Sequence, residues 1–267
     1  MNRETVIRLL EQNEILPANK FGQNFLCDDE ITSRIVEVSG IEPGDNVLEV
    51  GPGLGALTEK LIKKGCSVTA VEIDHKLADL LPKTIGDPNL RVIDCDFLKV
   101  SDIDLSSFDH AISNIPYYAM TPIMMRIISE MSNIRTMTFM VEDEAINRIA
   151  AKPKTKQYGP LSVLCSAFGT VKREFTVPKN CFYPMPHTTS AVITIKRHEK
   201  ALVSPDKGFM DLVTLCFSQR RKKLVNNCPE AKPVLASLGL SPDTLRAEDL
   251  TAMQYLELYD AMRKDMI

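Results

Sequence analysis

The stretch that decides the fold is Asn46-Val47-Leu48-Glu49-Val50-Gly51-Pro52-Gly53-Leu54-Gly55, a short apolar run that leads directly into a turn with three glycines. The apolar run predicts a buried strand over residues 46–50, and the pattern after the turn predicts a helix over about residues 56–64. Glycines allow positive φ and let the backbone approach a ligand closely. The stretch therefore indicates either a ligand-binding turn or a tight connection from strand to helix.

Short apolar runs continue to alternate with helical patterns along the chain. Further strands are predicted over residues 67–72, 90–93, 109–113 and 136–141, with helices over 76–81, 121–131, 142–151 and 161–168. Alternation of this kind is typical of a doubly wound parallel sheet. Two later runs, 171–176 and 191–196, are too close together for a long crossover helix, which favours an antiparallel pair closing the sheet. The predicted class is α/β, with a seven-stranded, mostly parallel, Rossmann-like sheet and helices on both faces.

The pattern changes after residue 199. The strand signal ends, and the periodicity becomes helical over residues 208–218, 221–226, 231–238, 242–247 and 251–263. We therefore predict two domains, an α/β domain over residues 1–199 and a small all-helical domain over residues 200–267.

Composition places the chain among ordinary globular proteins. It has 267 residues, of which 44% are hydrophobic and 25% charged. No apolar run reaches the length of a membrane span, and the polar N-terminus does not resemble a signal peptide. The seven cysteines are scattered and form no Cys-x-x-Cys pair. We therefore expect reduced thiols in a cytoplasmic protein, with no disulfide, no metal site and no membrane contact.

Charge is distributed unevenly along the sequence. Residues 1–112 carry 11 basic and 20 acidic side chains, whereas residues 148–200 carry 10 basic and 2 acidic ones. A further basic run is Arg220-Arg221-Lys222-Lys223. Such asymmetry indicates either a face for a polyanion or simply solvated charged surfaces.

Acidic residues follow the next two predicted strands. Glu72 ends the second strand, 21 residues beyond Gly51, where a carboxylate can accept hydrogen bonds from both hydroxyls of a ribose. Asp96 and Phe97 follow the third strand, where they could hold an adenine amino group and line the ring. The spacing of Gly51, Gly53 and Gly55 differs from the dinucleotide pattern Gly-x-Gly-x-x-Gly, and a carboxylate at Glu49 would repel a pyrophosphate. The turn instead resembles the loop with which S-adenosylmethionine-dependent methyltransferases hold the methionine end of their cofactor.

The fourth predicted strand leads into Asn114-Ile115-Pro116-Tyr117. The amide oxygen and a backbone carbonyl can accept hydrogen bonds from a planar amino group, proline fixes the backbone, and tyrosine can stack on a base. A strand end followed by a turn is the alternative reading of this stretch. Because the carboxyl ends of parallel strands form the ligand site of open α/β sheets, we expect it to lie beside Gly51, Glu72 and Asp96.

With these motifs together, the chain resembles the rRNA adenine dimethyltransferase family, most closely its bacterial small-subunit type. The resemblance covers nearly the whole length and rests on four further blocks: Lys20-Phe21-Gly22-Gln23-Asn24-Phe25-Leu26, Tyr158-Gly159-Pro160-Leu161-Ser162-Val163-Leu164, Phe182-Tyr183-Pro184-Met185-Pro186 and Phe217-Ser218-Gln219-Arg220-Arg221-Lys222-Lys223-Leu224. Tyr118 and Thr188-Thr189 depart from the family's usual pattern.

The resemblance implies a class I methyltransferase fold and S-adenosyl-L-methionine as the cofactor. We assign the cofactor site to Gln23, Asn24, Leu26, Glu49, Gly51, Gly53, Gly55, Glu72, Ile73, Asp96, Phe97 and Asn114. The catalytic stretch would be Asn114, Ile115, Pro116 and Tyr117, with Tyr117 and Phe182 against the target base.

The implied reaction is methylation of N6 on two adjacent adenosines of 16S rRNA. The partner would be this RNA within the small ribosomal subunit or an assembly intermediate, and we expect a monomer. Because a base in a helix cannot reach such a pocket, the target must be flipped or single-stranded. Candidate phosphate contacts are Lys152, Lys154, Lys156, Arg220, Arg221, Lys222 and Lys223, although Arg220–Lys223 could instead cap helices or pair with acids.

Two other functions remain open. One is a resistance-type methyltransferase acting on adenine N6 of 23S rRNA. The residues around Leu238-Gly239-Leu240 and Arg246–Leu250 resemble the small-subunit type, which disfavours that alternative. The other is a non-catalytic ribosome assembly or transcription factor that keeps the fold, which would predict a damaged glycine turn or a lost Asn114, and neither is seen.

Overall fold

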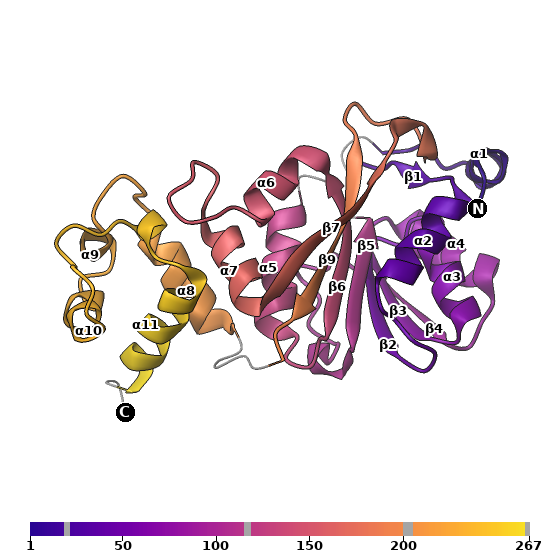
Figure 1. The fold of residues 1–267 in the computed structure, drawn as a ribbon. Coiled ribbons are helices and arrows are strands. Elements are labelled where there is room, and N and C mark those ends of the chain that lie inside the picture. Colours follow the sequence, from indigo (N-terminus) through magenta and orange to yellow (C-terminus); the bar gives the residue numbers. More distant parts are fainter. Residues whose placement is uncertain (19–21, 115–118, 200–204, 265–267) are drawn as a thin grey trace. The chain divides into compact units, whose positions relative to one another are not determined.

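The computed structural model describes residues 1–18, 22–114, 119–199 and 205–264, which form two compact units (Figure 1). The first unit comprises Met1–Met124, Asn133–Asp143 and Lys172–Ile195, and the second comprises Met125–Ser132, Glu144–Val171 and Lys196–Ile267. The second unit adds internal segments to the C-terminal helices, so the two units do not follow a single cut in the sequence. A domain boundary at residue 200 stays a prediction.

A seven-stranded sheet has the strand order β4-β3-β2-β5-β6-β9-β7 (Figure 1). Its strands are β2 (Asn46–Val50), β3 (Ser67–Glu72), β4 (Leu90–Asp94), β5 (His110–Asn114), β6 (Thr136–Glu142), β7 (Gly169–Val177) and β9 (Ser190–Arg197). The five strands from β2 to β6 pair in parallel. The start of β7 lies against the end of β9, where His198 N donates to Phe168 O at 3.1 Å, so these two strands run in opposite directions. The predicted α/β class with its mostly parallel sheet is confirmed.

Polar side chains begin three helices of the first unit. The helices of this unit are α1 (Arg3–Gln12), α2 (Asp29–Val38), α3 (Ala56–Lys64), α4 (His75–Ile85) and the start of α5 (Met120–Glu130). The rest of α5 belongs to the second unit. Asn2, Asp28 and Asp74 each accept a hydrogen bond from a backbone N–H in the first turn of α1, α2 and α4, respectively. These N–H groups have no partner within their helix, so the caps stabilise the helix ends.

A small two-stranded sheet joins the N-terminal segment to a later loop. In it β1 (Phe25–Leu26) pairs antiparallel with β8 (Phe182–Tyr183), and Leu26 lies opposite Phe182. The pairing continues where Cys27 N donates to Cys181 O at 2.8 Å. Neither strand was predicted, because two-residue strands carry no periodicity.

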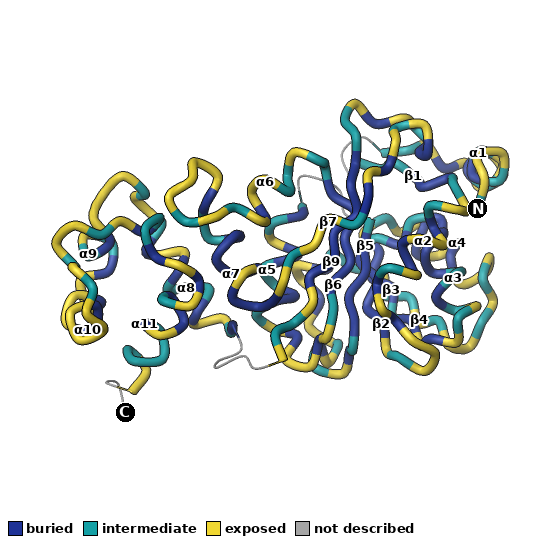
Figure 2. Tube along the Cα trace, in the orientation of Figure 1, coloured by how far each residue is buried: buried dark blue, intermediate teal, exposed yellow. Residues whose placement is uncertain are grey.

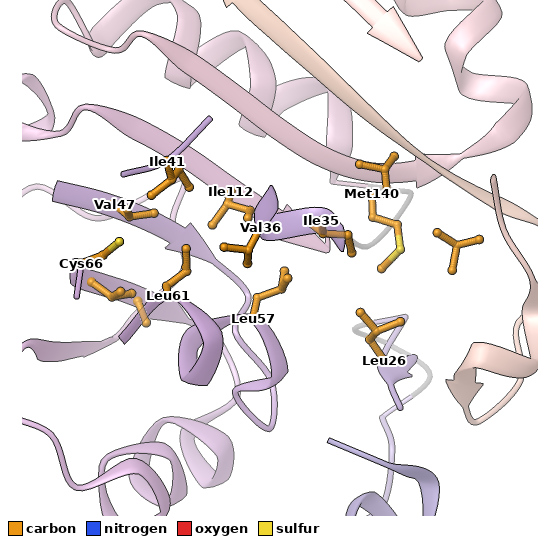
Figure 3. Packing of buried hydrophobic residues seen from close by; sticks show 14 of the residues in the cluster. Leu26, Ile35, Val36, Ile41, Val47, Leu57, Leu61, Cys66, Ile112 and Met140 are labelled. Carbon is orange, nitrogen blue, oxygen red and sulfur yellow. The ribbon is translucent and has the colours of Figure 1, made fainter. Parts of the chain in front are cut away.

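The core of the first unit forms where helices pack on the sheet (Figure 3). Ile35 and Val36 of α2, together with Leu57 and Leu61 of α3, belong to one buried cluster with Val47, Val68, Ala70 and Ile112 of the strands. Figure 2 shows the strands of the sheet as mostly buried. Burying each such side chain stabilises the fold by roughly 1.5–3 kcal/mol, so the sheet is a rigid base for the groups at its ends.

The second unit is helical. It contains α6 (Ile146–Ile149), α7 (Pro160–Phe168), α8 (Lys207–Cys216), α9 (Leu224–Asn227), α10 (Ala231–Ser237) and α11 (Ala252–Lys264). The ring of Phe217 lies 6.1 Å from the rings of both Tyr158 and Tyr255. The two buried tyrosine hydroxyls donate to the carbonyls of Leu250 and Ala247, so these rings satisfy their polar groups inside the unit.

Two predicted helices differ from the structure. Residues 142–151 form a 3₁₀ turn (Asp143–Ala145) and the short α6 rather than one helix. Residues 242–247 do not form a helix, because the backbone pairs with another segment: Leu224 N donates to Leu245 O at 2.8 Å, and Lys223 pairs antiparallel with Arg246. A 3₁₀ turn (Ala247–Asp249) follows; other 3₁₀ turns are Leu105–Ser107 and Lys179–Cys181.

Three further findings concern the described residues alone. None of their helices is both long and apolar enough to cross a membrane. None of their histidine, cysteine, aspartate and glutamate side chains form a group of three or more that could hold a metal ion. All seven cysteines carry free thiols, and all but Cys95 are buried.

Candidate functional site

One open pocket lies at the carboxyl ends of β2, β3, β4 and β5, entirely within the first unit. About 1300 Å³ of atom-free space lies in and above it, open solvent at its mouth included. All but one of the residues that were predicted to bind the cofactor line it: Gln23, Asn24, Leu26, Glu49, Gly51, Gly53, Glu72, Ile73, Asp96, Phe97 and Asn114. The structure therefore brings together groups from five separate segments, as expected for the carboxyl edge of a parallel sheet.

Gly55 is the exception, because it does not line the pocket. It caps the N-terminus of α3 with φ of 85°, and a Cβ added there would lie 2.4 Å from Leu81 Cδ1. In this structure it packs against Leu81, and its assignment to cofactor binding stays a prediction. Gly53, with φ of 59°, does line the pocket, and a Cβ there would lie 3.2 Å from Phe25 Cδ1. The turn thus needs glycine both for its backbone and for close packing.

Glu72 is held by backbone amides at the end of β3. Its side chain is 4% exposed, and its Oε2 and Oε1 accept hydrogen bonds from Gly53 N and Asp74 N, both at 3.0 Å. Burial raises the pKa of Glu72 above its ordinary value, although these backbone hydrogen bonds act in the opposite direction. The two amides therefore fix the carboxyl group at the wall of the pocket.

Glu49, at the floor of the same pocket, is more deeply buried. It is 1% exposed, and its Oε2 accepts a hydrogen bond from Thr58 Oγ1 at 2.7 Å. Burial, with a smaller contribution from the nearby Glu72, raises its pKa to about 8 against the hydrogen bond from the Thr58 hydroxyl. No lysine or arginine among the described residues lines the pocket. The pocket therefore places two acidic groups where a positively charged ligand would be stabilised.

A partly apolar slot lies beside the ends of β3 and β4. Ile73 and Leu98 are 43% and 41% exposed, whereas Phe97 is 4% exposed, and all three line the pocket. Asp96 Oδ1 accepts a hydrogen bond from Leu98 N at 3.0 Å, and Lys99 Nζ lies 3.9 Å from Asp96 Oδ2. The slot combines apolar side chains with an acceptor at its rim, an arrangement that suits a flat ring with an amino group.

Asn114 ends β5 and reaches the N-terminal segment. Its Nδ2 donates a hydrogen bond to Asn24 O at 3.1 Å. Among the described residues, none donates to its Oδ1. The other predicted catalytic residues, Ile115, Pro116 and Tyr117, lie outside the described residues.

Phe182 lies at the wall of the pocket but offers little surface. It is 1% exposed and belongs to the buried cluster that includes Leu26 and Ile35. A stacking contact between Phe182 and a base stays a prediction, and it would require the ring to become more accessible than it is here.

The predicted RNA contacts all lie in the second unit. Lys152, Lys154, Lys156, Arg221, Lys222 and Lys223 are exposed. Arg220 is not available in the same way: its guanidinium contacts Glu248 Oε2 at 2.7 Å and donates to the carbonyls of Thr155 and Lys156. Arg220 therefore fastens the loop of residues 152–156 to Glu248, which is the ion-pair alternative, and a contact of Arg220 with RNA stays a prediction.

Several residues of the site were missed from the sequence. Thr58 contacts Glu49, Phe25 covers Gly53, and Asp74 contacts both Glu72 and Gln23, where Gln23 Nε2 donates to Asp74 Oδ2 at 2.8 Å. Asp74 carried a usable signal, because an aspartate directly before a helical pattern indicates an N-cap. Thr58 and Phe25 carried none, since their roles depend on tertiary packing.

A family model and curated relatives place the chain in one family, and solved structures share its fold. A family model described as ribosomal RNA adenine dimethylase matches residues 17–264. A ribosomal RNA small subunit methyltransferase A from Chlorobium limicola is 39% identical, with 96% of this chain and 97% of that protein covered. Among solved structures, a dimethyladenosine transferase from Plasmodium falciparum has a TM-score of 0.72 at 23% identity, covering 91% of this chain and 98% of that one. The 23S rRNA methyltransferase ErmE has a TM-score of 0.61 at 25% identity, covering 90% and 100%.

Proposed function

Because the chain belongs to the ribosomal RNA adenine dimethylase family, we propose that it transfers methyl groups from S-adenosylmethionine to N6 of two adjacent adenosines in 16S rRNA. The fold is that of class I S-adenosylmethionine-dependent methyltransferases. The observation that carries the proposal is the position of Asn114 in one pocket with Glu49, Glu72 and Asp96. That pocket offers an acceptor for an amino group beside acidic groups suited to a cationic methyl donor.

The residues of the pocket fit this cofactor. When bound, S-adenosylmethionine supplies a methyl group on a positively charged sulfonium. Glu72 would accept hydrogen bonds from the ribose hydroxyls, and Asp96 would accept one from the adenine amino group while Ile73 and Phe97 cover the ring. The backbone at Gly51, where an added Cβ would meet nothing within 4 Å, leaves room for the methionine end. A bound sulfonium would favour the ionised form of these buried acids, whose pKa values burial otherwise raises.

Asn114 would orient the target rather than remove a proton. The lone pair of an exocyclic adenine nitrogen is delocalised into the ring, so the nitrogen needs placement and a polar environment more than a base. The Oδ1 of Asn114 and a carbonyl of Ile115 or Pro116 would accept its hydrogens, and Tyr117 would stack on the flipped base. Positioning and electrostatics would thus supply most of the lowering of the barrier. A second transfer to the same nitrogen requires fresh cofactor.

The exposed basic residues of the second unit are our candidates for phosphate contact. They are Lys152, Lys154, Lys156, Arg221, Lys222 and Lys223. The proposed partner is 16S rRNA within the small subunit or its assembly intermediate. We propose a cytoplasmic monomer that needs no metal.

Two observations weigh against the alternatives. Relatives that are 35–39% identical over about 95% of the chain carry the name ribosomal RNA small subunit methyltransferase A, which disfavours a 23S rRNA target. A non-catalytic factor would have no need for an ordered glycine turn, a fixed Glu72 and Asn114 in one pocket.

The test is methylation of small-subunit assembly intermediates with labelled S-adenosylmethionine, followed by mapping of the modified adenosines. We expect label on N6 of two adjacent adenosines of 16S rRNA, and a loss of at least about 100-fold in the Asn114→Ala variant, as for removal of a donor or acceptor that acts on the reacting group. Label confined to 23S rRNA would support the resistance-type alternative. Equal label with Asn114→Ala would contradict the proposed role of the amide.

A further inference from the structure

We propose that Gln23 is a positioning residue for methyl transfer. Gln23 and Asn24, here called the clip, hold residues 72–74 at the end of β3 in a fixed position relative to the Asn114 amide. The inference rests on the proposed function and concerns how the same site is organised. One half of the clip is a side-chain contact with the end of β3, and the other half is a backbone contact with the end of β5.

The first half of the clip is a hydrogen-bonded chain that leads to Glu72. Gln23 Nε2 donates to Asp74 Oδ2 at 2.8 Å, and Asp74 N donates to Glu72 Oε1 at 3.0 Å. Gln23 Oε1 accepts from Ala18 N at 2.8 Å, so both ends of the amide are occupied. Asp74 Oδ1 also accepts from Lys76 N at the start of α4. These partners fix the orientation of the Gln23 amide, because its donor faces an acid and its acceptor faces a backbone N–H.

The second half of the clip decides which way Asn114 points. Asn24 O accepts from Asn114 Nδ2 at 3.1 Å, which turns the amide nitrogen toward the N-terminal segment. The amide oxygen is then left for the amino group of the target. Without the Asn24 carbonyl, the amide could rotate and present its nitrogen to that amino group, and two donors would then face each other.

The two halves are linked because they belong to consecutive residues. Only the φ and ψ of Asn24 separate Gln23 from the peptide unit that carries the Asn24 carbonyl, so little backbone freedom lies between the two contacts. The following residues cannot absorb the displacement freely, since Phe25 and Leu26 pair with β8 and Phe25 packs against Gly53. The clip is therefore held on one side by Asp74 and on the other by Asn114.

The link predicts a particular pattern of kinetics. Weakening the contact between Gln23 and Asp74 should lower kcat through the misplaced Asn114 more than it raises the KM for the cofactor. Misplacing a catalytic group by about 1 Å can cost roughly 100-fold in rate. A purely structural role for Gln23 would instead lower stability and leave the kinetics of the folded fraction unchanged.

The test exchanges donor and acceptor across the contact. Gln23→Glu places two carboxylates against each other, so we expect kcat to fall about 10–100-fold. Asp74→Asn keeps a good helix cap but turns an amide toward the Gln23 amide, so we expect a smaller fall. In the double variant Gln23→Glu with Asp74→Asn, the new amide at position 74 donates to the new carboxylate at position 23, while Ala18 N keeps its acceptor. Shape and total charge are those of wild type, so we expect kcat to return to within about 3-fold of wild type, since most of the lost orientation is restored.

Two readouts besides activity accompany the kinetics. The first is the dissociation constant of S-adenosylhomocysteine in the absence of RNA, and the second is hydrogen exchange of the amides of Ala18 and residues 22–26. We expect faster exchange in Gln23→Glu and wild-type protection in the double variant. Gln12→Glu, which adds the same charge on the exposed end of α1, serves as the matched control and should behave like wild type.

The outcomes separate the clip from the proposed function. If wild type methylates no rRNA, the proposed function fails, whereas the exchange and dissociation measurements still report on the clip. If wild type is active but the double variant remains as slow as Gln23→Glu, or if all variants keep wild-type kcat, the coupling between Gln23 and Asn114 is wrong.

Discussion

The acidic side chains at the two ends of the parallel strands have different partners. At the amino ends, Arg135 Nη2 lies 2.5 Å from Asp45 Oδ1 and 3.3 Å from Asp109 Oδ1, so acids and a base neutralise each other. At the carboxyl ends, Glu49 and Glu72 are buried with only a hydroxyl and backbone amides as partners. The charges at the amino ends are therefore paired with each other, whereas the acids at the carboxyl ends gain a charged partner only when a positive group binds.

The pKa values follow the same division. Burial alone would raise the pKa of Asp45, but the Glu42 amide, the Arg135 guanidinium and the charge of His110 together lower it. Among the residues that the structure describes, no comparable cation acts on Glu49, and its pKa is raised to about 8. The two ends of one sheet can therefore hold a carboxyl group in two ways: ion-paired with a lowered pKa, or without a cation, with a raised pKa and free to interact with a ligand.

The largest expected effect comes from the protonation of Glu49. Its folded pKa is raised from 4.5 to about 8, so the folded state holds this proton more tightly than the unfolded chain does. The stability that this proton contributes is fully present below about pH 4.5 and is lost as the pH rises through about 8, a total of a few kcal/mol at roughly 1.4 kcal/mol per unit of pKa. Urea unfolding at pH 5, 7 and 9 should show this decline in wild type and a flatter profile in Glu49→Gln. Parallel profiles for the two proteins would show that Glu49 ionises normally in the fold.

A second effect concerns cofactor affinity. Glu72→Ala removes the proposed ribose ligand and leaves the amides of Gly53 and Asp74 without their acceptor. We expect the dissociation constant of S-adenosylmethionine, measured by calorimetry, to rise about 100-fold, because hydrogen bonds to a charged group are worth about 1.5–3 kcal/mol. Asp109→Ala, at the opposite end of the sheet, is the matched control and should bind normally. A similar loss of affinity in both variants would erase the distinction between the two ends.

The amino end should respond in stability alone. Asp45→Ala removes the acceptor of Glu42 N and the partner of both Arg135 and His110. Arg135 is 55% exposed, so screening by solvent limits its share. We expect the free energy of unfolding to fall by about 1–2 kcal/mol, mainly through the lost backbone hydrogen bond and the altered surroundings of His110. Cofactor affinity of the folded variant should stay within about 2-fold of wild type, since the site lies at the other end of the strands.

Much of this division could be predicted from the sequence. The glycine turn, Glu72, Asp96 and Asn114 each follow an apolar run that is long enough to identify as a strand, so their common position at one edge followed from topology. The prediction missed β1, β8 and the contact of Gln23 with Asp74, because two-residue strands and contacts 51 residues apart leave no local signal. α1 and α2 were missed as well, although Asn2 and Asp28 precede them as caps.

Gly55 and Arg220 make tertiary contacts that their neighbouring residues in the sequence do not specify. A glycine in a ligand-binding motif and an arginine in a basic run both look functional when only the neighbouring residues are known. Their packing partners, Leu81 for Gly55 and Glu248 for Arg220, lie 26 and 28 residues away in the sequence. Residue type therefore identified each motif, whereas the packing contacts of its members became known only from the tertiary structure.

The smallest expected effect is a loss of stability toward acidic pH that comes from His110, at the amino end of β5. His110 is 2% exposed, and burial lowers its pKa, although the nearby Asp45 acts in the opposite direction. Its Nε2 lies 3.0 Å from Asp45 Oδ2, and this attraction opposes the effect of burial without outweighing it. Because the folded pKa is lowered, the unfolded chain binds the proton first, and stability is lost as the pH falls below about 6.5. Over this range the loss opposes the gain in stability from the protonation of Glu49, so unfolding between pH 7 and pH 5 should show a larger rise in stability in His110→Gln than in wild type. If His110→Gln instead reduced the decline in stability between pH 7 and pH 9, the ionisation of His110 and Glu49 would be coupled. The contrast between the two ends would then be lost.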